Sequence, residues 1–189
     1  MNTLILTFND TIAAMRLHAM LALSFIALLW GIQVINFLLG YRLNILGIYP
    51  RHIFGLFGIA CSPFLHASFT HVLFNSIPLF FLASLVASLG KHIFFTVSLY
   101  IIAIGGVGVW IFGRKGLHVG ASGLIMGYLA FLLTQAYFSH SPFGLVVGLL
   151  TLYYCGSLLL NLIPTEVRTS FEGHIFGFAA GIASYWLIY

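Results

Sequence analysis

Charged side chains are scarce in this chain. Only 5% of its 189 residues are Asp, Glu, Lys or Arg, and only 3 residues are acidic. Soluble domains carry roughly 25% charged residues, so this composition excludes an ordinary water-soluble fold. Hydrophobic residues make up 61% of the chain, which predicts an integral, multi-pass membrane protein with the lipid bilayer as its surroundings.

The few basic residues and cysteines exclude further classes. The 7 Lys and Arg residues are scattered, so they form no basic stripe for nucleic acid. Cys61 and Cys155 lie in separate apolar segments without a CxxC or a Cys/His zinc spacing, and there is no His-Glu-x-x-His motif. We therefore expect no metal site and no cofactor. The first residues lack a basic cluster and a small-residue cleavage site, which favours a retained span over a signal peptide.

The apolar runs predict one all-α membrane domain over residues 1–189, with about six spans of ~20 residues each. Helices are expected because the runs are continuous and lack the alternation of barrel strands. A mixed connection, 41–65, follows the first span, and a polar connection, 164–172, precedes the last. After a short N-terminal segment, 1–17, the expected spans are 19–40, 66–89, 93–112, 119–138, 143–163 and 173–189.

The order of these spans brings distant polar residues together. In a serial chain the second, fourth and sixth spans enter from the same face, so their N-terminal ends share one side of the membrane. Those ends carry His66, His71 and Asn75, then Ser122, then His174. Polar groups at membrane depth are costly, so this convergence is a functional hypothesis.

Glycines four residues apart predict which helices touch. Such strips let two backbones approach closely. If the fourth and sixth spans pack together, Ser122 and His174 come within hydrogen-bond reach, and a serine beside a neutral imidazole is an activated nucleophile. Taken singly, Ser122 could serve packing and His174 could be a structural donor. The strips comprise Gly123 and Gly127 on the fourth span, and Gly173, Gly177 and Gly181 on the sixth.

His71 and Asn75 stand at positions i and i+4, hence on one helical face. Their side chains can donate hydrogen bonds to the charge that develops on an attacked carbonyl, together with the backbone N–H of Ser122. The alternative is a polar pair that ties the long connection to the bundle. His66 lies outside this face and is expected to order the connection.

Together these motifs resemble the rhomboid intramembrane serine proteases. The resemblance covers about residues 50–181 and implies that Ser122 is the nucleophile and His174 the general base. It also implies that His71, Asn75 and the Ser122 N–H form the oxyanion hole. Derlins and inactive rhomboids lack the Ser/His pair, so its presence here favours an active enzyme. The matching motifs are His66-x4-His71-x3-Asn75, Gly120-x-Ser122-Gly123 with Gly127, and His174-x2-Gly177-x3-Gly181.

The resemblance extends to the minimal six-span bacterial type. It implies single-pass or polytopic membrane proteins as substrates, a bacterial inner membrane, and an active site that faces the periplasm. The positive-inside tendency disagrees, since it would place most of the basic residues on the cytoplasmic side. Many rhomboids also carry a Trp-Arg pair where this chain has Phe57-Gly58.

Two other functions remain open from the residues alone. The polar side chains could line a small transporter or channel, although their restriction to one side argues against a pathway through the full depth. The chain could also be a non-catalytic, rhomboid-like binding protein. No sequence feature indicates an oligomeric state.

Overall fold

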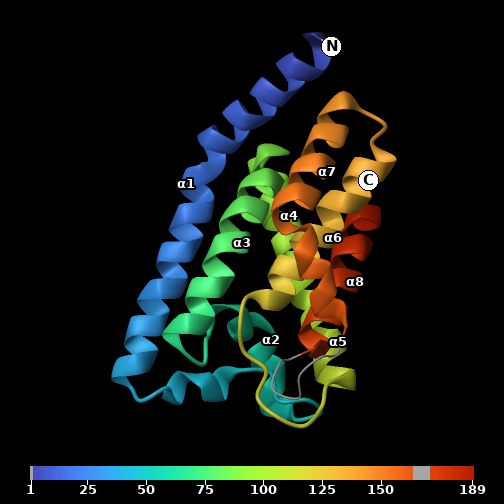
Figure 1. Cartoon of the computed structure of the whole chain (residues 1–189). Coiled ribbons are helices and arrows are strands. Elements are labelled where there is room, and N and C mark those ends of the chain that lie inside the picture. The colour runs from blue at the N-terminus through green and yellow to red at the C-terminus, as the bar shows by residue number, and fades with distance from the viewer. Residues whose placement is uncertain (1, 164–170) are drawn as a thin grey trace.

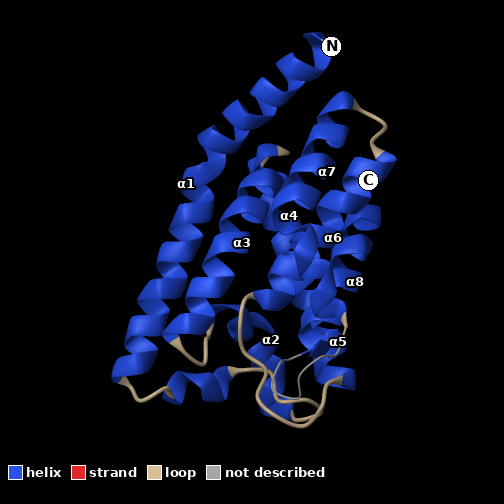
Figure 2. Cartoon of the chain, in the orientation of Figure 1, coloured by secondary structure: helices blue, strands red, loops and turns tan. Residues whose placement is uncertain are grey.

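The computed structural model describes residues 2–163 and 171–189, and all regular structure within these ranges is helical (Figure 2). The predicted all-α class is therefore confirmed. Across the described residues, 4 helical segments are long and apolar enough to cross a bilayer, and Ser122–Phe138 is apolar but shorter. The chain is an integral membrane protein. The 4 segments are Ile5–Leu38, Phe69–Ser88, Lys91–Phe112 and Pro142–Leu160.

Helix α1, Asn2–Leu38, is the longest and lies along one side of the bundle (Figure 1). It starts well before Ala19, where the sequence predicts the first span, because no proline or glycine precedes Gly31 to interrupt it. It packs against α3, where the Trp30 Nε1–H donates to Ser76 Oγ at 3.1 Å.

The connection after α1 crosses the end of the bundle that lies opposite both chain termini (Figure 1). Several of its apolar side chains are exposed, among them Ile53 at 70% and Phe54 at 73%. Exposed apolar side chains of this kind agree with the mixed, partly apolar character of the connection in the sequence. The connection contains η1 (Arg42–Leu46), η2 (Ile53–Leu56), α2 (Phe57–Cys61) and η3 (Ser62–Phe64).

Helix α3, Phe69–Ser88, begins after Ser68, whose Oγ accepts the His71 N–H at 3.1 Å. This cap places His66 outside the helix, although the sequence suggested a span from residue 66. The next span contains a π-helical turn, η4 (Ile101–Gly105), between α4 (Lys91–Tyr100) and α5 (Gly106–Phe112).

Helix α6, Ser122–Phe138, lies at the centre, and its residues from Leu124 to Leu132 are buried. Helix α7 (Pro142–Cys155) continues as η5 (Gly156–Leu162), and α8 (Phe171–Ile188) closes the bundle against α6. Most of the polar connection predicted over 164–172 lies outside the described residues. Figure 1 shows that α3, α6 and α8 all begin near the end that carries the first connection, as their order predicts.

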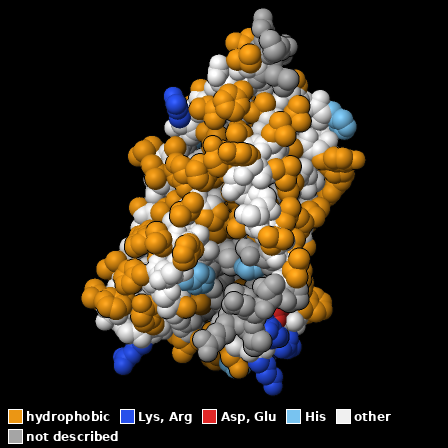
Figure 3. Space-filling view, viewed as in Figure 1, with side chains coloured by type: hydrophobic (Ala, Val, Ile, Leu, Met, Phe, Trp, Pro, Cys, Tyr) orange, Lys and Arg blue, Asp and Glu red, His pale blue; other side chains and the backbone are white. Residues whose placement is uncertain are grey.

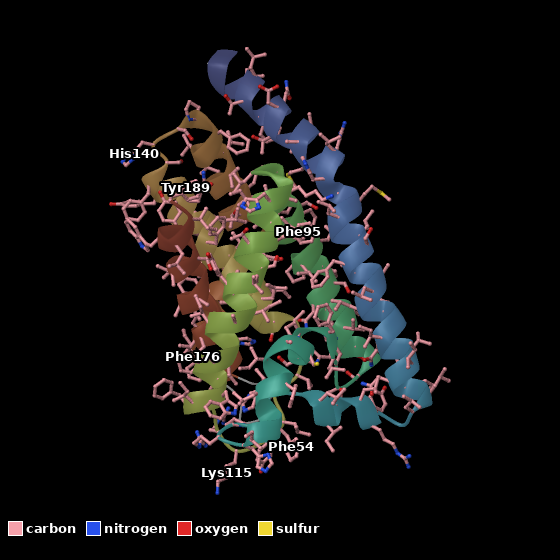
Figure 4. The ribbon with its side chains drawn as sticks, turned by 180° about the vertical axis from the view of Figure 1, so that it is seen from behind. Phe54, Phe95, Lys115, His140, Phe176 and Tyr189 are labelled. Carbon is pink, nitrogen blue, oxygen red and sulfur yellow. The ribbon has the colours of Figure 1, made fainter. Side chains whose placement is uncertain are left out.

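The surface has the distribution of a membrane protein. Hydrophobic side chains cover the sides of the bundle, whereas Lys and Arg gather toward its ends (Figure 3). From behind, Phe54 and Lys115 mark one end, His140 and Tyr189 mark the other, and Phe95 lies on the side between them (Figure 4). An apolar belt between polar ends is what a bilayer requires.

Candidate active site

Glycines bring α6 and α8 into backbone contact. A Cβ atom added to Gly177 would lie 2.1 Å from the Gly123 carbonyl oxygen, and one added to Gly181 would lie 2.1 Å from the Gly127 oxygen. A Cβ on Gly123 would lie 3.1 Å from the Gly173 oxygen. The two strips predicted from the sequence therefore face each other, and no side chain separates them.

Ser122 is the first residue of α6 and is half-buried. The first N–H groups of a helix have no partner within it, and the helix N-terminus carries partial positive charge. Before Ser122, Gly120 has the left-handed φ of +125°, and its N–H donates to the Ser62 carbonyl at 2.9 Å. This sharp turn leads directly into the start of α6.

His71 and Asn75 reach the same turn from α3. A Cβ on Gly120 would lie 2.8 Å from His71 Cε1 and 2.9 Å from His71 Nε2, so the imidazole rests directly on this glycine. Asn75 lies one helical turn further along and is buried. Its Nδ2 has no hydrogen-bond partner within the described part of the chain, which leaves a donor available.

One cavity of about 900 Å³ is lined by Ser122, His174, His71 and Asn75 together. Four polar residues from three helices, α3, α6 and α8, therefore converge on a single space. The rest of the lining is mostly apolar, as is common in binding cavities that hold a few polar groups. Figure 3 shows histidine side chains at the surface on this face of the molecule. The apolar lining includes Phe74, Ile77, Phe81, Ile125, Met126 and Tyr154.

His66 is not among the residues that line the cavity. It is fully buried, its ring meets His71 edge-on at 5.0 Å, and its Nε2 accepts the Ala121 N–H at 3.4 Å. Burial, followed by the charge of His71, lowers the pKa of His66 to about 3. The neutral ring can therefore accept this hydrogen bond at physiological pH.

Glu172 is held away from the cavity by Arg114, which follows α5. The Arg114 Nη2 donates to Glu172 Oε2 at 3.1 Å, and both its Nε and its backbone N–H donate to Oε1, at 2.5 and 3.2 Å. The carboxylate does not line the cavity that contains His174. The sequence alone does not link Arg114 to Glu172, because the two residues lie 58 positions apart with no motif that joins them.

The remaining histidines and the two cysteines are dispersed. Within residues 2–163 and 171–189, no three His, Cys, Asp or Glu side chains come together in an arrangement that would hold a metal ion. Cys155 borders the cavity from the end of α7, whereas Cys61 closes α2. At Phe57-Gly58, the glycine is needed for packing, because a Cβ on Gly58 would lie 2.3 Å from the Gly47 carbonyl carbon.

The fold and the cavity define a helical membrane protein with a polar site at the beginnings of three helices. The Rhomboid domain model matches residues 51–189, and the chain belongs to the rhomboid family. The Uncharacterized proteins Rv1337 of Mycobacterium tuberculosis and Mb1372 of Mycobacterium bovis are each 37% identical over 175 residues, or 88% of this chain and 73% of the relative. The "Putative rhomboid protease YdcA" of Bacillus subtilis is 32% identical over 124 residues, or 62% of this chain and 59% of the relative.

Proposed function

We propose that this protein is an intramembrane serine endopeptidase that cleaves single-pass or polytopic membrane proteins within or beside their spans. Ser122 is the nucleophile and His174 the general base. The observation that supports this most is the shared cavity, whose lining includes both side chains beside the glycine contact of α6 and α8. The family supports the same reaction, since a relative is named as a rhomboid protease.

In the proposed reaction, the Ser122 Oγ attacks the scissile carbonyl carbon while His174 accepts the hydroxyl proton. His174 then returns that proton to the leaving amine as the peptide bond breaks, which leaves an acyl-enzyme. Water, deprotonated by the same imidazole, attacks the ester, and the second product leaves as Ser122 regains its proton. The 900 Å³ cavity gives water access to this site.

The negative charge on the attacked oxygen needs donors that are already in place. Asn75 Nδ2 is buried without a hydrogen-bond partner among the described residues, and the His71 ring is fixed above Gly120. These two side chains and the Ser122 N–H at the start of α6 form the proposed oxyanion hole. Removing one such donor typically lowers the rate about 100- to 1000-fold.

The proposed pair is a dyad without a carboxylate. In a serine triad, an acid orients the histidine and stabilises its imidazolium form. Here Glu172, two residues before His174, is engaged by Arg114 and lies outside the cavity lining. In this proposal the packing of α6 against α8 helps to orient the His174 ring, and slower turnover than that of a triad enzyme is expected.

We further propose six membrane spans, with α6 and α8 added to the four long apolar segments. Both termini lie at one end of the bundle and the first connection lies at the other (Figure 1). In a bacterial inner membrane, the termini would be cytoplasmic and the cavity would open toward the periplasm. An alkaline phosphatase reporter fused after Tyr189 tests this topology. Because the reporter is active only outside the cytoplasm, its activity there would show that the orientation is the reverse of the one proposed.

The test of function is cleavage of a purified transmembrane substrate in proteoliposomes. Ser122→Ala and His174→Ala should each abolish cleavage while the protein stays folded, because the two side chains act as one chemical unit. The matched controls are Ser24→Ala on the exposed side of α1 and His140→Ala at the opposite end of the bundle. Substantial cleavage by Ser122→Ala or His174→Ala would refute the assignment of these two residues as nucleophile and base.

A further inference from the structure

We propose that Arg51 and Trp110 are positioning residues for Ser122. They fasten the first connection, residues 41–68, to the end of α5, and that connection in turn holds the segment 113–121, which leads into Ser122. The effect on catalysis rests on the proposed function, whereas the effect on the backbone does not.

Arg51 and Trp110 join the connection to α5 by four hydrogen bonds. The Arg51 Nη1 donates to the carbonyl oxygens of Ile111 and Gly113, both at 2.9 Å. The Arg51 N–H donates to the Trp110 oxygen at 2.9 Å, and the Trp110 Nε1–H donates to the His52 oxygen at 2.9 Å. Carbonyl groups at a helix C-terminus lack intrahelical partners and carry partial negative charge, so a cation suits them.

The backbone of Arg51 shows that this attachment is specific. Arg51 has a φ of +58°, in the left-handed region that residues other than glycine seldom occupy. Such a conformation costs free energy and persists where surrounding contacts hold it. Here both the side chain and the N–H of Arg51 are bonded to the end of α5, so the conformation and the attachment maintain each other.

The connection supplies the hydrogen-bond acceptors for the segment before Ser122. Ile48 and His118 exchange a pair of backbone hydrogen bonds, which form an isolated antiparallel bridge. All of the acceptors below lie in the connection, so its displacement would move the turn that presents Ser122. The donor and acceptor pairs are His118 N–H with Ile48 O at 2.9 Å, Gly120 N–H with Ser62 O at 2.9 Å, and Ala121 N–H with His66 Nε2 at 3.4 Å.

Close packing couples the first connection to the segment 113–121. A Cβ on Gly47 would lie 2.8 Å from the His118 carbonyl oxygen and 2.6 Å from Val119 Cγ1. On its other side, a Cβ on Gly58 would lie 2.3 Å from the Gly47 carbonyl carbon. The segments around Gly47, Gly58 and His118 are thus closely packed, and close-packed regions transmit strain.

The kinetic test compares three arginine variants in the full chain. Arg51→Asn removes the cation but keeps a residue that tolerates left-handed backbone. It should lower kcat on the order of 10- to 100-fold with KM within about twofold, because Ser122 is displaced while the substrate cavity persists. Arg51→Lys should restore most of kcat, since one nitrogen makes both side-chain bonds. The control is Arg42→Asn, which removes an exposed arginine from the same connection and should leave kcat unchanged.

Three kinetic results would overturn the inference. The first is an equal loss of kcat in Arg42→Asn, which would indicate a general effect of charge. The second is a failure of Arg51→Lys to restore kcat. The third is a loss in Arg51→Asn that merely follows the folded fraction measured by thermal unfolding in detergent. Trp110→Phe, which removes only the Nε1–H donor, should show a smaller loss in the same direction.

A second readout does not depend on proteolysis. In the Ser122→Ala background, Arg51→Asn should accelerate hydrogen–deuterium exchange of the His118 and Gly120 N–H groups about tenfold, because local opening of the segment becomes easier. Arg42→Asn should leave that exchange unchanged. Accelerated exchange in a protein that cleaves nothing would refute the proposed protease but uphold the positioning role. Unchanged exchange in Arg51→Asn would overturn the positioning role whatever the activity.

Discussion

A single methyl group at Gly177 should separate the two helices that bear Ser122 and His174. The added Cβ would lie 2.1 Å from the Gly123 oxygen, whereas ordinary contact begins at 3.4 Å, so the backbones must part by roughly 1.3 Å. A misplacement of about 1 Å can lower the rate on the order of 100-fold. Overpacking should also reduce the free energy of unfolding by about 1–3 kcal/mol.

The assay for Gly177→Ala is kcat for substrate cleavage together with the unfolding midpoint in detergent. Gly105→Ala is the graded control, because its Cβ would lie 3.3 Å from the Phe176 oxygen, and its loss should be only a few-fold. Gly31→Ala has no neighbouring atom within 4 Å and should leave kcat unchanged. If Gly177→Ala matched Gly31→Ala within twofold, the helix contact would not set the distance between nucleophile and base.

Three other substitutions probe the rest of the site by the same cleavage assay. Gly120→Ala should lose more than about 100-fold in kcat, because it strains a left-handed backbone and drives a Cβ into the His71 ring; near-normal turnover would contradict this geometry. Asn75→Ala should lower kcat about 100- to 1000-fold with little change in KM, and a change in KM alone would point to substrate binding. Glu172→Gln should stay within about tenfold, since its carboxylate pairs with Arg114; a loss of several orders of magnitude would make it a third catalytic member.

The contact between α6 and α8 could be predicted because the glycines that form it recur at a regular spacing in the sequence. Glycines four residues apart, at Gly123 and Gly127 and from Gly173 to Gly181, mark one face of each helix without reference to the rest of the chain. The alternation of span direction likewise predicts that α3, α6 and α8 begin at one end of the bundle. Periodicity and order depend only on local sequence, so they are readable before the fold is known.

The support around the site could not be predicted in the same way. Arg51 bonds to α5 across about 60 positions of sequence, and Arg114 pairs with Glu172 across a similar separation. The turn at Gly120 and the bridge between Ile48 and His118 are irregular backbone, which carries no repeating signal. Such contacts depend on tertiary placement, and they decide how accurately the predicted residues are held.

The catalytic dyad is tested most directly by the site at which a fluorophosphonate probe reacts, located by mass spectrometry of the intact membrane protein. The proposed dyad predicts one adduct, on Ser122 Oγ, which forms on the folded protein and is lost or greatly slowed in His174→Ala because the serine then has no base. An adduct on another serine, or labelling of Ser122 at the same rate in His174→Ala, would contradict the proposal that these two residues form the catalytic dyad.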